Sequence, residues 1–149
     1  MNVKGLVENA AASIVSSSLA ANNITDWNIY TGMGTGSIGF PCVKIICDTY
    51  SPYYPELNIG IGRARLKIIT CANKVMGTNA GEGTSSTEFE AVSDYAINPF
   101  LKDNVAVTFG GYENNLIVKQ VIEDGLTIST LDDGWVANQS FQVVCGRTS

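Results

Sequence analysis

The last third of the chain contains a sharply delimited helix pattern, and this segment constrains the fold most. Ser85 and Glu88 form the S-x-x-E signature of a capped helix start. The segment 87–98 (TEFEAVSDYAIN) continues at helical spacing up to Pro99, which disfavours a helical conformation in the residue before it. We therefore predict a helix here that packs one apolar face against the rest of the domain.

Strand-like runs follow this helix at 116–125, 126–130 and 134–149. Asp124-Gly125 and Asp133-Gly134 are signals for tight hairpin turns between these runs. In the last run apolar and polar residues alternate, so one face of the strand is expected to pack on a core and the other to meet solvent. The apolar face comprises Trp135, Ala137, Phe141, Val143 and Cys145.

The rest of the chain supplies one more helix and three strands. Apolar residues at helical spacing predict an amphipathic helix over about 2–21, and strand patterns cover 27–31, 40–47 and 59–72. The apolar patch at 105–109 and the turn-like residues 110–115 are expected to form a connection. This order is typical of an α+β fold, with a mainly antiparallel sheet and two helices packed on one side. We expect a single domain spanning residues 1–149.

The composition fits a globular domain and argues against several chemistries. Hydrophobic residues make up 45% of the 149 residues and charged residues 15%, the opposite of a disordered chain. The net charge of −5 disfavours non-specific nucleic-acid binding as the main task. Histidine, the commonest general base and metal ligand, does not occur. We expect no enzymatic activity, no cofactor and no metal.

The cysteines fit buried, reduced thiols better than a metal site or a disulfide scaffold. They are Cys42, Cys47, Cys71 and Cys145. No two of them form a C-x-x-C pair, and no histidine could complete a mixed zinc site. No apolar run reaches membrane-spanning length, and Glu8 interrupts the apolar stretch that a signal peptide would need. We expect a protein made in the cytoplasm that stays soluble and makes no membrane contact.

A glycine-rich segment matches a cofactor motif in its letters only. Gly34, Gly36 and Gly39 fit G-x-G-x-x-G after a possible strand. The dinucleotide fingerprint needs a helix directly after it, whose N-terminus holds the pyrophosphate. Pro41 and a β-branched strand follow here instead, so we expect a loop without a cofactor. A nucleotide-binding enzyme using this loop is the alternative from another class, and nucleotide-induced thermal stabilisation would reveal it.

Two groups of residues are candidates for contact with a partner. Arg63, Arg65 and Lys67 alternate along one predicted strand, so their side chains share a face. This stripe is either a solvated sheet face or a cationic surface for acidic groups of a neighbouring subunit or for passing DNA, and the overall acidity favours a protein partner over DNA.

The second group consists of Tyr50, Tyr53 and Tyr54, in a segment with turn-forming prolines. Tyrosines of this kind are enriched at protein interfaces, although the segment could equally pack on its own domain. A small ligand-binding β-rich module that uses these tyrosines is a further alternative.

The whole element order resembles the tail terminator, or tail completion, proteins of long-tailed bacteriophages. The likeness lies in the first helix (VENAAASIVSSSLA), the strand GFPCVKIIC, the long basic strand, the second helix and the closing IEDGLTISTLDDGWVANQSFQVVCGR. It covers nearly the whole chain as a pattern, and the family has no invariant catalytic motif. The long, glycine-rich segment Asn73 to Ser86 departs from that pattern.

The resemblance implies a structural protein of the virion, present in the host cytoplasm during assembly. Family members form a homo-oligomeric ring, commonly a hexamer, on the head-proximal end of the tail tube. The ring stops polymerisation of the tail tube protein, joins the head–tail connector protein and lets DNA pass through its centre. We predict that the residues facing the lumen are mainly polar or acidic, so that DNA passes without specific binding. Expected ring contacts are the strand 59–72, the segment 50–57 and the first helix. Another neck component, such as a head-completion or connector protein, is the nearest alternative.

Overall fold

The computed structural model describes residues 2–32, 39–53, 60–74 and 83–148, which form an α+β fold. In chain order the elements are α1 (Val3–Ala21), β1 (Asn28–Thr31), β2 (Cys42–Pro52), β3 (Ile61–Asn73), α2 (Ser86–Ile97), the 3-10 helix η2 (Asn98–Leu101), α3 (Val105–Tyr112), β4 (Leu116–Thr130) and β5 (Gly134–Arg147). The predicted fold class is confirmed, whereas the predicted number of two helices is wrong, because a third α-helix follows η2.

The described strands form one sheet in the order β1-β2-β3-β5-β4. Pairing is antiparallel between β2 and β3, β3 and β5, and β5 and β4. The short strand β1 instead runs parallel to β2, so the sheet is mixed and mostly antiparallel. This order places β4 at one edge of the sheet and β1 at the other.

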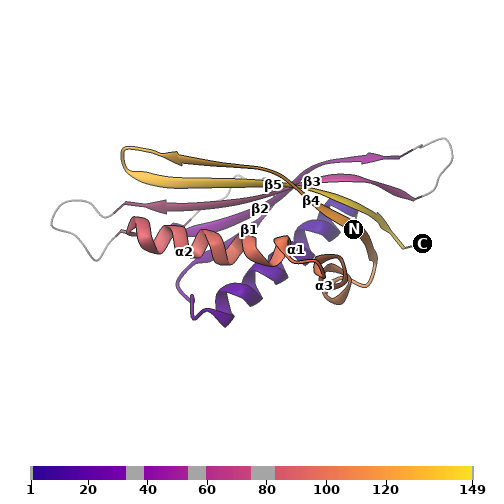
Figure 1. Cartoon of the computed structure of the whole chain (residues 1–149), viewed down its shortest axis with the longest axis horizontal. Helices are drawn as coiled ribbons and strands as arrows, with labels where there is room; N and C mark the ends of the chain where they lie inside the picture. The colour runs from indigo at the N-terminus through magenta and orange to yellow at the C-terminus, as the bar shows by residue number, and fades with distance from the viewer. Residues whose placement is uncertain (1, 33–38, 54–59, 75–82, 149) are drawn as a thin grey trace.

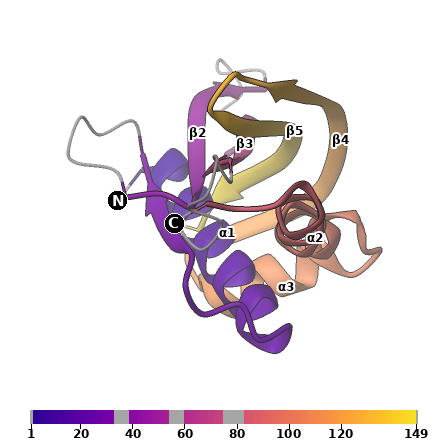
Figure 2. The same cartoon turned by 90° about the vertical axis from the view of Figure 1, so that its left-hand side faces the viewer.

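The helices cover one side of the sheet, as predicted. Figure 1 shows α1, α2 and α3 beneath the strands, and Figure 2 shows that the sheet curves so that its hollow side faces them. The core is formed between these layers, where Phe141 of β5 lies 5.4 Å from Phe100 of η2 between ring centroids. Burying a side chain of this size stabilises a fold by about 1.5–3 kcal/mol.

The two predicted helices are confirmed together with the local signals that delimit them. Asn2 caps α1, since its side chain accepts the backbone N–H of Gly5 at 2.9 Å. Ser85 accepts the backbone N–H of Glu88 at 3.2 Å and so caps α2. The helix α2 ends at Ile97, and the tighter η2 turn continues through Pro99.

The third helix corrects the expected connection at 105–115. Val105 and Phe109 lie four positions apart in α3 and are both buried in the core. Gly110 and Gly111 disfavour a helix by about 1 kcal/mol each relative to alanine. Burial of the Val105 and Phe109 side chains in the core outweighs that cost. The local sequence does not reveal this tertiary contribution.

The strand β4 corrects a second prediction. Asp124-Gly125 is not a hairpin turn, because β4 runs without interruption from Leu116 to Thr130. The register shifts between Glu123 and Leu126, and Gly125 adopts φ 122° there, which marks a β-bulge. The turn lies only at 131–133, where Asp133-Gly134 was expected to form it. Aspartate–glycine pairs suit both geometries because glycine tolerates positive φ.

Candidate assembly surface

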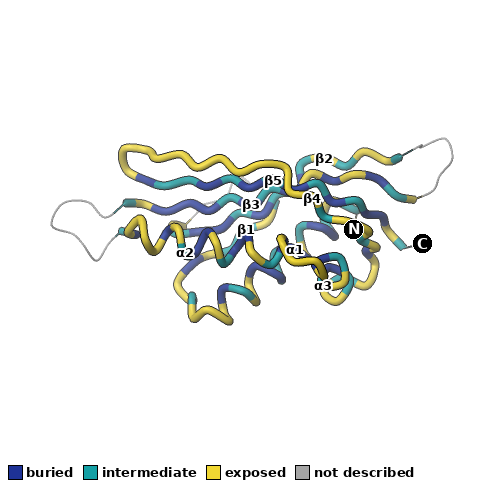
Figure 3. The backbone as a smooth tube through the Cα atoms, viewed as in Figure 1, coloured by how far each residue is buried: buried dark blue, intermediate teal, exposed yellow. Residues whose placement is uncertain are grey.

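The edge strand β4 carries four exposed large apolar side chains, those of Ile117, Ile122, Leu126 and Ile128. Figure 3 shows it exposed along most of its length, in contrast to the neighbouring β5. Ile128 and Leu126 are 61% and 49% exposed, although they lie in a long strand that pairs with β5. An edge strand with large apolar side chains offers both unpaired backbone groups and apolar surface to another chain. Soluble monomers usually protect such an edge.

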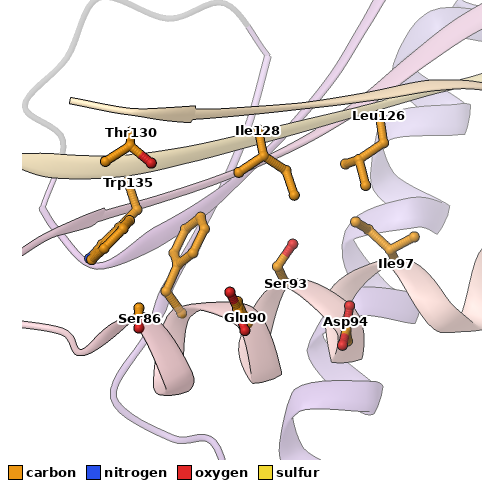
Figure 4. A pocket seen from close by; sticks show the side chains of 10 residues that line it. Ser86, Glu90, Ser93, Asp94, Ile97, Leu126, Ile128, Thr130 and Trp135 are labelled. Atoms are coloured by element: carbon orange, nitrogen blue, oxygen red, sulfur yellow. The ribbon is translucent and has the colours of Figure 1, made fainter.

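A groove of about 300 Å³ lies between the distal half of β4 and the helix α2. Figure 4 shows Leu126 and Ile128 pointing from the strand toward the helix, with Trp135 at one end of the groove and Ile97 at the other. The strand therefore overhangs the helix without packing on it. The core is closed in the middle of the sheet and left open at this edge.

The walls of this α2–β4 groove are apolar and held in place. Phe89 is buried at its base, and its ring stacks on Trp135 with centroids 6.0 Å apart. Trp135 donates its Nε1–H to the carbonyl of Thr84 at 3.2 Å. These contacts fix the aromatic wall before any partner binds, and a preorganised surface loses less entropy on association.

The rim of the groove on the helix side is acidic. Glu90 and Asp94 lie one helical turn apart on α2, line the groove and are exposed. Neither carboxylate forms an ion pair within the described residues. Asp132 and Asp133 add negative charge in the neighbouring β4–β5 turn. Lys74 is also at this end, with its ammonium 4.8 Å from the centre of the Trp135 ring.

The predicted basic stripe shares one face of β3, but its members have different surroundings. Arg63, Arg65 and Lys67 alternate with buried residues along the strand. Asp48 of β2 binds two of them, with 2.7 Å from its Oδ2 to Arg65 Nη2 and 3.3 Å to Lys67 Nζ. Hydrogen bonding from Arg65 lowers the pKa of the Asp48 carboxyl to about 2. Two of the three cations are thus already partnered within the chain.

Arg63 has a different partner from the rest of the stripe. Its Nε–H donates to the hydroxyl of Tyr53 at 3.0 Å, and its guanidinium carbon lies 5.6 Å from the centre of that ring. Within the described residues Arg63 meets no carboxylate. Among the described residues it is therefore the member of the stripe that no carboxylate neutralises.

The three candidate tyrosines do not form one surface. Tyr50 belongs to β2 rather than to a loop, is half-buried, and donates its hydroxyl to the carbonyl of Cys145 at 3.3 Å. It packs on its own domain. Tyr53 directly follows β2 beside Arg63, whereas Tyr54 falls outside the described residues. Of the three, Tyr53 is the one that the structure places next to a candidate cation.

The groove residues were missed by the sequence analysis. Leu126 and Ile128 lie in the run 126–130, which was correctly predicted as a strand, but their shared face was not singled out as a contact surface. The expected turn at Asp124-Gly125 hid the length of that strand. Glu90 and Asp94 carried a weak signal, because a predicted helix with acidic residues and no lysine or arginine has an unbalanced charge.

The glycine motif lies mostly outside the part of the chain that the structure describes. Gly34 and Gly36 fall outside it, and the N–H of Gly39 donates to the Tyr30 hydroxyl at 2.9 Å. No group of histidine, cysteine or acidic residues among the described residues could hold a metal ion. No helix in those segments is long and apolar enough to cross a membrane.

The four cysteines are free and buried, as expected. Burial raises the pKa of the Cys47 and Cys145 thiols to about 12, so both stay protonated and pack as small apolar groups. Cys42 and Cys71 are cross-strand partners, and the hydrogen bond between them raises the pKa of Cys42 and lowers that of Cys71.

No protein-family model matches the chain, and no curated protein matches it significantly. The functional argument therefore rests on the exposed edge, the groove and the charges described above.

Proposed function

We propose that this protein is a structural subunit of a bacteriophage tail, a tail terminator that assembles into a homo-oligomeric ring at the head-proximal end of the tail tube. The observation that carries the proposal is the uncovered apolar edge formed by β4 over α2. A fold that leaves part of its core open at one sheet edge is suited to completing that core with another chain. Ring closure would remove every such edge at once.

The proposal extends to the partners and place that the resemblance implies. The ring, of six subunits as is common in the family, would stop polymerisation of the tail tube protein and contact the head–tail connector protein. DNA would pass through the lumen without specific binding, which agrees with the net charge of −5. The protein would act in the virion after assembly in the host cytoplasm, without enzymatic activity. Another neck component remains the nearest alternative, and preferential binding to the portal side over tail tube ends would favour it.

The exposed edge gives the proposal its test. Replacing Leu126 and Ile128 by serine removes apolar surface that the isolated chain leaves in water, so folding should be preserved. We expect the Leu126→Ser/Ile128→Ser variant to be monomeric at concentrations where the parent chain is oligomeric, as measured by multi-angle light scattering.

The matched control is Val107→Ser, since Val107 is 78% exposed on α3, away from the groove. This variant should keep the oligomeric state of the parent. Equal loss of assembly in both variants, or unchanged assembly of the Leu126→Ser/Ile128→Ser variant, would contradict the role of the β4 edge.

A further inference from the structure

We propose that Cys42 and Cys71 form a redox-active dithiol site, in which a low-molecular-weight disulfide such as oxidised glutathione converts the two thiols into a disulfide between β2 and β3. The proposal goes beyond the structural role inferred above and does not depend on assembly, because both sulfurs belong to one subunit. It rests on the strand register, on the contact between the two thiols and on the face of the sheet that carries them.

The two cysteines lie directly opposite each other on adjacent strands. Cys42, the first residue of β2, pairs with Cys71 of β3 in the antiparallel register. Directly opposed side chains of such a pair point to the same face of the sheet. Their Cα atoms are about 4.5–5.5 Å apart, within the range that disulfides span in proteins. The register alone thus places the two residues at a separation that a disulfide can bridge.

The two thiols also contact each other. A hydrogen bond joins them, and it raises the pKa of Cys42 and lowers that of Cys71. The positive charge of the Lys44 ammonium also lowers the pKa of Cys71. Because the thiolate and not the thiol attacks a disulfide, Cys71 is the nucleophile of the pair and Cys42 keeps its proton at first.

The pair lies on the outer face of the sheet, the face opposite the helices. The adjacent residues Val43 and Ala72 belong to the apolar core between the sheet and the helices, whereas Cys42 and Cys71 do not. Figure 2 shows the described helices on the hollow side of the sheet, so none of them covers the outer face. Cys71 is 7% exposed and Cys42 is fully covered. A small disulfide that approaches from outside therefore meets Cys71 first.

The other two cysteines provide a contrast within the same chain. Cys47 and Cys145 belong to the core on the helix side, and their cross-strand partners on β3 are Leu66 and Gly62. Burial raises the pKa of both thiols to about 12. Protonated, enclosed thiols are poor nucleophiles, so both should stay reduced under conditions that oxidise the outer pair.

The reaction is a thiol–disulfide exchange in two steps. The Cys71 thiolate attacks one sulfur of oxidised glutathione, which forms a mixed disulfide and releases the first glutathione as a thiolate. The Cys42 sulfur then attacks Cys71 Sγ, forms the bond between the strands and releases the second glutathione. The two protons that the cysteines give up end on the two released glutathione molecules. Two protein thiols are thus oxidised while one small disulfide is reduced.

The bond should be easy to reverse. The carbonyls of Pro41 and Ile45 accept hydrogen bonds from β1 and the residue after it, so the backbone groups of Cys42 face β3 and its pair with Cys71 is of the hydrogen-bonded type. The Cβ atoms are farther apart in this type, whereas a disulfide holds them about 3.8 Å apart. Closing the bond draws the strands together, and a strained disulfide is reduced more readily. The site therefore suits a switch that follows the surrounding thiol–disulfide balance.

Oxidation of the folded full-length chain tests the site. After incubation with excess oxidised glutathione, alkylation in denaturant and peptide mapping should show one intramolecular disulfide, between Cys42 and Cys71. Cys47 and Cys145 should be recovered as alkylated thiols. The same treatment in concentrated urea should give mixed pairings and glutathione adducts, because the fold no longer holds the two sulfurs together. Returning the folded sample to excess reduced glutathione should restore both thiols.

Single variants separate the roles of the two sulfurs. In Cys42→Ser the hydroxyl can still donate to the Cys71 thiolate but cannot resolve the adduct, so glutathione should remain attached to Cys71. In Cys71→Ser the remaining outer thiol is covered, so an adduct should form at least about tenfold more slowly. The matched control Cys47→Ala should form the disulfide at the rate of the parent. Circular dichroism checks the fold of each variant, and the peptide map of the parent identifies the bond even if a variant fails to fold.

Four outcomes would overturn the proposal. If all four thiols of the folded parent remain open to alkylation, the pair is not redox-active. A disulfide that joins other cysteines or two subunits would contradict the site. Equal rates of adduct formation in the two serine variants would contradict the roles of Cys71 and Cys42. A bond that resists excess reduced glutathione would be a permanent crosslink. Each of these results would leave the proposed ring untouched, because the ring rests on the β4 edge.

Discussion

At the scale of single residues, Asp48 determines which cations of the outer sheet face can serve a partner. It binds Arg65 and Lys67 and leaves Arg63 with a tyrosine as its neighbour. The alternation of the three cations was predictable from the two-residue period of a strand. The neutralisation of Arg65 and Lys67 was not predictable, because Asp48 is 17 positions away from Arg65 and meets it only through the pairing of β2 with β3.

The Asp48 cluster predicts a pH-dependent contribution to stability. The pKa of Asp48 falls from 3.8 to about 2 on folding, so its stabilisation is present above pH 3.8 and is lost as the pH falls toward 2. We expect Asp48→Asn to lower the free energy of unfolding by about 1 kcal/mol at neutral pH, allowing for solvent screening. The difference from the parent should shrink to near zero around pH 2, as measured by urea denaturation.

The exposed Asp26 gives the control for this series. Asp26 forms no ion pair within the described residues, so Asp26→Asn should match the parent at both pH values. A loss of stability in Asp48→Asn that is as large near pH 2 as at neutral pH would show that shape or packing, and not the charge of Asp48, is responsible.

At the scale of elements, the boundaries of α2 could be predicted because nearby residues set them. Features that depend on packing against the core could not be predicted. The cap at Ser85 and the stop before Pro99 delimited α2 correctly because both act within a few residues. The helix α3 was missed because its two glycines oppose it and only the core favours it. The bulge in β4 was mistaken for a turn because Asp124-Gly125 fits both, and this error concealed the groove.

The bulge predicts opposite effects for two glycine substitutions. Gly125 has φ 122°, and its carbonyl accepts a hydrogen bond at 3.0 Å from the buried side chain of Gln139. We expect Gly125→Ala to destabilise the fold by about 1 kcal/mol or more, since alanine is strained at positive φ. Gly110→Ala should stabilise it by up to about 1 kcal/mol, because Gly110 is helical and a Cβ there meets open space.

Urea denaturation of the two variants measures both effects. Each variant is a control for the other, because both replace glycine by alanine but are expected to change the free energy of unfolding in opposite directions. Stabilisation by Gly125→Ala would contradict the bulge, and destabilisation by Gly110→Ala would contradict the helical assignment of α3.

At the scale of the whole molecule, the chain is asymmetric in both shape and charge. The apolar groove with its acidic residues lies between β4 and α2, and the Arg63 guanidinium lies over the Tyr53 ring where β2 ends and β3 begins. Composition revealed a globular, acidic protein but could not reveal this polarity, because the groove forms only where β4 overhangs a helix more than twenty residues earlier in the chain. The fold class follows from local patterns, whereas the candidate assembly surface follows from tertiary structure.

The molar mass of the full-length chain in solution, followed from dilute samples up to about 1 mM and accompanied by negative-stain images, tests the central claim most directly. We predict an increase from one subunit to a single closed species, about six times heavier, that appears as a ring with a central opening. A chain that remains monomeric throughout this range and also on added tail tube ends would contradict it, as would open filaments of indefinite length.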